Sequence, residues 1–274
     1  MIETIHEMLS YSFINRALIA GLLISVCASL LGVSLVLKKF SMIGDGLSHV
    51  GFGSLAVATA LGFSPLKFTI PVVIVVSFFI LKLNENHKIN GDAAIALVSA
   101  SSLAIGIMAI SVTTGVNTDI NNYLFGSILS MGKEDVLISV VLSIVVIGLF
   151  LFSYHKIFAV TFDEKFAAST GVKTNLYNII LAVLCSITVV LGMRMMGALL
   201  ISSLIIFPTL SSMQLFKTFQ KVIISSCVVS VICYLIGLTI SYKYATPTGA
   251  SIVLINLIAL LSLYAIGFVK RQKQ

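Results

Sequence analysis

The chain has 274 residues, of which 58% are hydrophobic and only 10% are charged, and its mean hydropathy is +1.12. Soluble domains of this length do not have such a composition, so the sequence predicts a protein that crosses a membrane several times, without room for a soluble catalytic domain. The net charge of +7 comes from basic residues in the breaks between apolar segments, which argues against a nucleic-acid-binding patch.

Nine apolar segments follow one another along the chain, separated by short polar breaks. They predict an all-α, polytopic membrane protein of eight or nine transmembrane helices, forming a single domain over residues 1–274. A helix needs about 20 apolar residues to cross a bilayer, so the shorter segments are expected to be tilted, broken or re-entrant. The segments are 14–37, 46–63, 66–83, 93–113, 135–154, 176–193, 196–208, 222–240 and 250–269.

Basic residues in the breaks predict the orientation of these segments. One set of alternate breaks, with the C-terminal tail, carries 12 of the 17 Lys and Arg residues. The positive-inside rule places this set in the cytoplasm, with the C-terminus inside and, if all nine segments cross, the N-terminus outside. The 12 residues are Lys38, Lys39, Lys82, Lys88, Lys156, Lys165, Lys173, Lys217, Lys221, Lys270, Arg271 and Lys273.

Asp45 and His49 are two ionisable residues among Gly, Ser, Val, Leu and Ala at the start of the second segment. Four residues apart on a helix, they project from the same face. An ionisable side chain at membrane depth costs a few kcal/mol and by default indicates a functional site. Carboxylate and imidazole are ligands that suit divalent first-row metals. The alternative is an Asp that caps the helix, with a satisfied His one turn later.

Small residues surround this pair. Gly44, Gly46, Gly51 and Gly53 predict close helix packing or local unwinding beside it. Other reactive side chains have simpler explanations, and Arg194 is expected to snorkel or to pair with an acidic residue. Glu3, His6 and Glu7 are expected to form a solvated face near the terminus, and His87 and His155 are expected to lie in cytoplasmic breaks. Core packing is the expected role of Met193, Met195, Met196 and the cysteines Cys27, Cys185, Cys227 and Cys233.

Pro208 ends the seventh segment, and residues 209–221 follow it with an amphipathic pattern. Met213, Phe216 and Gln220 share a helical face beside Leu210, whereas the Lys residues lie elsewhere. This pattern predicts a short helix along the inner membrane surface, with a plain loop as the alternative. No Walker A or HExxH motif occurs in the chain, so active transport would need energy from a partner or a coupled ion.

Five motifs occur in order along nearly the whole chain. They are LGVSLVLKK with GDGLSH (31–49), NYLFGSILSMGKED (122–135), TFDE with TGV (161–172), GALL through IFP (197–208) and ATPTGA (245–250). Together they resemble the integral-membrane permease of the zinc, manganese and iron(II) importing class of bacterial ABC transporters. The resemblance implies the fold of a type II ABC importer permease in the bacterial cytoplasmic membrane, with no enzymatic activity of its own.

The resemblance also implies partners and a substrate. The partners are a second copy of the chain, two cytoplasmic ATP-binding subunits and an extracytoplasmic metal-binding protein, with no nucleic acid. The substrate is a divalent ion rather than a permanently bound cofactor. Zinc is favoured over manganese by similarity at 123–128 and 241–250.

The resemblance further assigns roles to individual residues. Asp45 and His49 would line the ion pathway, and residues 209–221 would couple to the ATPase. The coupling contacts would come from Pro208, Thr209, Leu210, Met213, Phe216 and Lys217. Three departures stand out. The family usually has Ala in place of Gly46 and often Pro in place of Gly51-Phe52-Gly53, and Met213 replaces a common Arg, leaving Lys217 as the nearest basic residue.

Three other functions remain as alternatives. A permease for a metal chelate such as a siderophore or cobalamin would share the architecture but need a wider pathway. An ion-coupled secondary transporter would need intramembrane carboxylates beyond Asp45, and the sequence offers almost none. An intramembrane enzyme would need a third ligand or a nucleophile beside Asp45 and His49.

Overall fold

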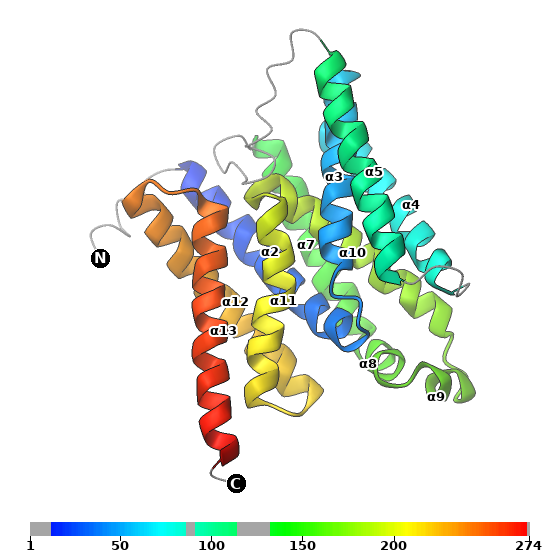
Figure 1. Ribbon diagram of the computed structural model, residues 1–274, viewed down its shortest axis with the longest axis vertical. Helices are drawn as coiled ribbons and strands as arrows, with labels where there is room; N and C mark the ends of the chain where they lie inside the picture. The colour runs from blue at the N-terminus through cyan, green and yellow to red at the C-terminus, as the bar shows by residue number, and fades with distance from the viewer. Residues whose placement is uncertain (1–11, 86–90, 114–131, 273–274) are drawn as a thin grey trace.

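The computed structural model describes residues 12–85, 91–113 and 132–272, which form helices and no strands (Figure 1). Nine long helices correspond one for one to the nine predicted segments, which confirms the all-α membrane fold. These are α2 (Ser12–Leu37), α3 (Ile43–Ala60), α4 (Pro65–Glu85), α5 (Gly91–Val112), α7 (Lys133–Phe152), α10 (Thr174–Met196), α11 (Ala198–Leu215), α12 (Phe219–Tyr244) and α13 (Thr248–Gln272). Two short helices, α8 (Tyr154–Phe162) and α9 (Glu164–Ser169), fill the break between α7 and α10.

Seven of the long helices within the described ranges are long and apolar enough to span a membrane, so the prediction of eight or nine was slightly high. The two that fall short are α3 and α11. Asp45, His49 and four glycines lower the hydropathy of α3, and among the described residues α11 contributes a shorter apolar stretch, Leu200–Leu215. Both helices are largely buried, so protein rather than lipid surrounds much of their surface.

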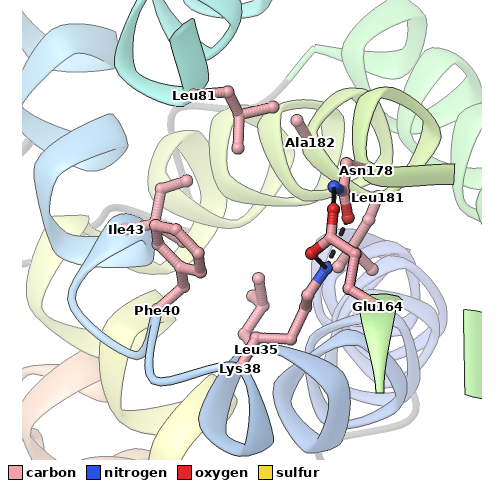
Figure 2. Close-up of a pocket in the computed structure, with 9 residues that line it drawn as sticks. All are labelled: Leu35, Lys38, Phe40, Ile43, Leu81, Glu164, Asn178, Leu181 and Ala182. Atoms are coloured by element: carbon pink, nitrogen blue, oxygen red, sulfur yellow. Dashed lines mark hydrogen bonds and ion pairs between the residues drawn. The ribbon is translucent and has the colours of Figure 1, made fainter. Parts of the chain in front are cut away.

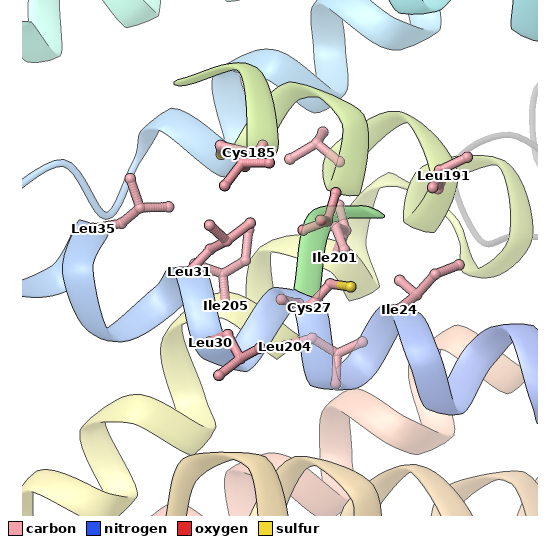
Figure 3. Close-up of a cluster of buried hydrophobic side chains, with 14 of the residues drawn as sticks. Ile24, Cys27, Leu30, Leu31, Leu35, Cys185, Leu191, Ile201, Leu204 and Ile205 are labelled. Atoms are coloured by element: carbon pink, nitrogen blue, oxygen red, sulfur yellow. The ribbon is translucent and has the colours of Figure 1, made fainter. Parts of the chain in front are cut away.

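The core lies where α2, α10 and α11 cross. Figure 3 shows Ile24, Leu31 and Leu35 of α2 facing Cys185 of α10 and Ile205 of α11, all of them buried. The peripheral helices α4, α5, α7 and α13 bury only 22–28% of their most apolar stretch, which suits contact with lipid or with another subunit. All four cysteines are free, and three of them (Cys27, Cys185 and Cys233) are buried, in agreement with their predicted packing role.

Ion pairs confirm the grouping of the polar breaks into two sides. Lys38 lies 3.6 Å from Glu164 at the end predicted to be cytoplasmic. At the other end, Lys67 lies 3.3 Å from Glu134, and Arg194 lies 2.8 Å from Asp135. Each pair joins two breaks that were assigned to the same side, and Asp135 is the acidic partner expected for Arg194. The short helices α8 and α9 lie toward the same end of the molecule as the C-terminus (Figure 1).

The separate amphipathic helix predicted for 209–221 is wrong. Instead, α11 continues through Pro208 to Leu215, the chain turns at 216–218, and α12 begins at Phe219. The Thr209 hydroxyl supports α11 past the proline: it donates to the Ile205 carbonyl of the same helix at 3.0 Å and lies 3.4 Å from the Ser226 hydroxyl of the neighbouring α12. The apolar periodicity therefore marks a face packed against protein.

Candidate metal-transit site

Asp45 and His49 lie one turn apart on the same face of α3, as their spacing predicts. The distance from His49 Nε2 to Asp45 Oδ2 is 3.7 Å, which is too long for a strong hydrogen bond. The side chains are 38% exposed for Asp45 and 26% for His49, so both face accessible space. Met42, not Asp45, occupies the N-cap position of α3, which argues against the capping alternative. The two groups are thus placed to share a cation.

Ser202 of α11 is a third polar group at this site. Its hydroxyl donates to Asp45 Oδ1 at 3.2 Å, joining two helices that are 157 residues apart at this point. Such a bond fixes the orientation of the carboxylate while leaving Oδ2 toward His49. Sequence reasoning missed this residue, although the Ser202-Ser203 pair interrupts an otherwise apolar run and could have drawn attention.

Neither nitrogen of the His49 ring has a strong hydrogen-bond partner among the described residues. Its Nδ1 is buried and has no hydrogen-bond partner among the described residues. Only a long contact with Asp45 engages the other nitrogen, Nε2. Neutral imidazole is a common metal ligand through either ring nitrogen. Nε2, the nitrogen beside the Asp45 carboxylate, is therefore free to bind a cation.

Close packing fixes the backbone of α3 around the site, as the glycines predict. A Cβ at Gly46 would lie 2.5 Å from Ile95 Cγ2 of α5, and one at Gly44 would lie 2.8 Å from Ile205 Cδ1 of α11. Farther along, a Cβ at Gly53 would lie 2.3 Å from the Ser102 carbonyl oxygen. Real Cβ contacts are not this short, so α3 fits between α5 and α11 only because these positions lack side chains.

The described residues of one chain supply only part of a ligand set. Among the described residues, no group of three or more His, Cys, Asp and Glu side chains could hold a metal ion. Met193 is fully buried and packs with Phe52 and Leu55, which agrees with the packing role predicted for it. The Tyr123–Gly126 motif, Glu3, His6, Glu7 and His87 lie outside the described residues.

The residues predicted to couple to the ATPase differ in their exposure to solvent. Pro208 and Thr209 are buried, and Leu210 and Met213 are partly buried within α11. Phe216 and Lys217 are exposed at the turn between α11 and α12, so these two are the ones that can reach a partner. Sequence reasoning missed a second exposed apolar surface at this end, formed by Phe158 and Phe162 of α8 and Phe166 of α9.

A multi-pass helical bundle with a carboxylate, an imidazole and a hydroxyl converging between its helices has the construction of a membrane permease. Residues 10–267 match the ABC 3 transport family, and the chain therefore belongs to this family. This match confirms the resemblance found in the sequence motifs. It also argues against the secondary transporter and the intramembrane enzyme.

Named relatives of the chain are metal importers. The manganese import system permease protein ScaB of Streptococcus gordonii is 30% identical over 263 residues, covering 96% of this chain and 94% of that protein. The high-affinity zinc uptake system membrane protein ZnuB of Buchnera aphidicola is 28% identical over 237 residues, covering 86% and 90%. The structure of PsaBC from Streptococcus pneumoniae in complex with Fab contains a chain with a TM-score of 0.86 and 28% identity, with coverage of 96% and 95%.

Proposed function

We propose that this chain is the membrane subunit of an ATP-driven importer of divalent metal ions and that the ion passes Asp45 and His49. The observation that carries the proposal is the convergence of Asp45, His49 and Ser202 on one accessible point between α3 and α11. Relatives named as manganese and zinc permeases support the same substrate class.

The chain would work as a homodimer, because the described residues of one copy supply too few ligands. Two copies around a shared axis would offer two carboxylates and two imidazoles. Four such ligands suit tetrahedral zinc, and they also suit manganese with water completing its shell. A transit site must also release its ion, so a small ligand set with long internal contacts is an advantage. Zinc is the ion favoured by the sequence motifs, and manganese is the close competitor.

The ATP-binding subunits would dock at the end that carries α8, α9 and the α11–α12 turn. Phe219, the first residue of α12, joins these parts: its ring centroid lies 5.1 Å from that of Phe158 and 5.9 Å from that of Phe162. The exposed Phe216 and Lys217 therefore continue the aromatic surface of α8. Exposed apolar patches of this kind mark protein interfaces more often than free surface.

The test is uptake of radiolabelled zinc and manganese in a strain that lacks this chain, complemented with wild type, Asp45→Asn or His49→Ala. We expect wild type to restore uptake of one ion and both variants to lose it while still co-purifying with the ATPase. Glu134→Gln is the matched control for loss of a carboxylate, because Glu134 is 76% exposed and pairs with Lys67 at the end opposite the proposed docking surface.

Two results would contradict the proposal. Normal accumulation by either variant would remove that residue from the pathway. Uptake of neither ion by wild type, with its partners present, would contradict an importer of bare ions and favour the alternative, a permease for a metal chelate.

A further inference from the structure

Three polar side chains from three separate elements meet at the end that carries the proposed docking surface. Lys38 follows the last residue of α2, Glu164 is the first residue of α9, and Asn178 lies in the first turns of α10. Lys38 Nζ donates to Asn178 Oδ1 and lies 3.6 Å from Glu164 Oε2, while Asn178 Nδ2 donates to Glu164 Oε1 at 2.7 Å (Figure 2). Every pair in this triad is thus in direct polar contact.

Burial makes this triad more than a surface ion pair. The Lys38 side chain is only 12% exposed, whereas Glu164 is half exposed at 49%. Burial lowers the pKa of the Lys38 ammonium, and the adjacent Glu164 carboxylate acts in the opposite direction. A buried charge that loses its partner is costly, so Lys38 and Glu164 are expected to move together rather than separate.

Glu164 is the main attachment of α9 to the helix bundle. All six residues of α9 are described, and Ala167 is the one that is buried. Asp163 caps the helix by accepting from the Phe166 amide at 2.9 Å, while the Phe166 side chain points to solvent. With so little apolar contact, α9 can shift when a partner binds, and its polar bonds to Lys38 and Asn178 carry that shift inward.

A short, well-ordered turn connects Lys38 to the metal-transit site. Lys39 adopts the left-handed conformation with φ of 61° and ends α2. The Phe40 amide then bonds to the Leu35 carbonyl at 2.8 Å, and the Ile43 amide bonds to the Phe40 carbonyl at 3.1 Å. Helix α3 starts at Ile43, with Asp45 in its first turn. A displacement of Lys38 thus reaches Asp45 through six intervening residues, whose backbone hydrogen bonds restrict their movement.

A small cavity beside the triad leaves room for such a displacement. Its volume is about 90 Å³, and apolar side chains of α4 and α10 close it on the far side. Figure 2 shows Phe40 and Ile43 of the turn on one side of this space and Lys38 with Glu164 on the other. Apolar side chains form most of the lining of this small space and the triad forms the rest, so a shift of the triad and of the adjoining turn can be taken up there.

We propose that Lys38, Glu164 and Asn178 form a positioning link that transmits movement of α9 to Asp45 during each ATP cycle. The three residues do not bind the ion, but they set where the first turn of α3 stands relative to α11. This inference rests on the proposed function, since it requires an ATPase docked at α8 and α9 and an ion at Asp45.

The test uses the complete transporter, purified with its own ATPase and reconstituted in vesicles with its binding protein. Ions transported per ATP hydrolysed are measured for zinc and for manganese in wild type, Glu164→Gln and Lys38→Met. Lys39→Met is the matched control because Lys39 is adjacent, exposed and outside the triad. The exchange Lys38→Glu with Glu164→Lys is the rescue variant, since a reversed Asn178 amide can bond both groups again.

We expect both single variants to keep ATPase association and hydrolysis but to transport about fivefold fewer ions per ATP. The exchange variant and Lys39→Met should keep the wild-type ratio. An unchanged ratio in both single variants would overturn the link while leaving the proposed function intact. Loss of association and thermal stability in both variants, without rescue by the exchange, would show a merely structural role. Transport of neither ion by wild type would instead remove the proposed function, and the link with it.

Discussion

Helices α3 and α9 are held in place by opposite means. Helix α3 buries 13 of its 18 residues, and its glycines bring its backbone against α5 and α11. Helix α9 buries one residue of six and is attached through the side chain of Glu164. The helix that carries the proposed ion ligands is thus fixed by backbone contact, whereas the helix at the proposed docking surface depends on a few polar bonds. A permease needs one rigid and one movable element. The geometry of its ligands must be reproducible, while the ATPase must be able to displace a helix that it contacts.

The packing of α3 should be the most sensitive feature of the molecule. Gly53→Ala would place a methyl group 2.3 Å from the Ser102 carbonyl oxygen, where backbone and not a flexible side chain is in the way. We expect a loss of about 3 kcal/mol in the free energy of unfolding, seen as a large drop in thermal stability in detergent. Gly148→Ala in α7 is the control, since a Cβ there meets nothing within 4 Å. Equal stability of the two variants would show that α3 is not packed as described.

The docking surface should respond to changes that leave α3 intact. Phe162→Ser and Phe216→Ser remove aromatic rings that are 58% and 37% exposed. We expect each to weaken binding of the purified ATPase about tenfold, or about 1.4 kcal/mol, without a matching loss of thermal stability. Tyr244→Ser is the control, because its ring is also exposed but lies at the opposite end of α12. Full ATPase affinity in both variants would show that the ATPase docks on another part of the molecule.

The smallest effect is expected at Ser202, which orients a ligand without being a charged ligand itself. Ser202→Ala removes the hydroxyl that donates to Asp45 at 3.2 Å. We expect the ion concentration for half-maximal uptake to rise about fivefold, which corresponds to the loss of one hydrogen bond of ordinary net strength, about 1 kcal/mol. Ser203→Ala is the control, since the Ser203 hydroxyl donates to the Leu200 carbonyl of its own helix. An unchanged half-maximal concentration for Ser202→Ala would limit the site to Asp45 and His49.

The sequence predicts those parts of the molecule that depend on local spacing. The nine apolar segments, the common face of Asp45 and His49, and the close packing around Gly46 all follow from periodicity and residue size. Even the pairing of Arg194 follows from the cost of an isolated charge, although Asp135 could not be chosen from the sequence.

Contacts between distant segments explain what the sequence does not predict. Ser202 reaches Asp45 only because α11 packs against α3, and no local pattern contains that fact. The amphipathic pattern of 209–221 has a similar explanation. An apolar stripe at Leu210 and Met213 looks the same whether it faces a lipid surface or a neighbouring helix, and here it lies in α11 beside α12 and α13.

The reactivity of the buried cysteines can report whether the helix bundle is folded. Cys27, Cys185 and Cys233 are buried in the folded protein, so a thiol-reactive dye can reach them only after the structure opens. Dye uptake on heating would therefore follow the opening of the bundle without any added label. In the folded protein, a single cysteine introduced at the exposed turn would react far faster than these, which would make the approach of the ATPase visible by fluorescence.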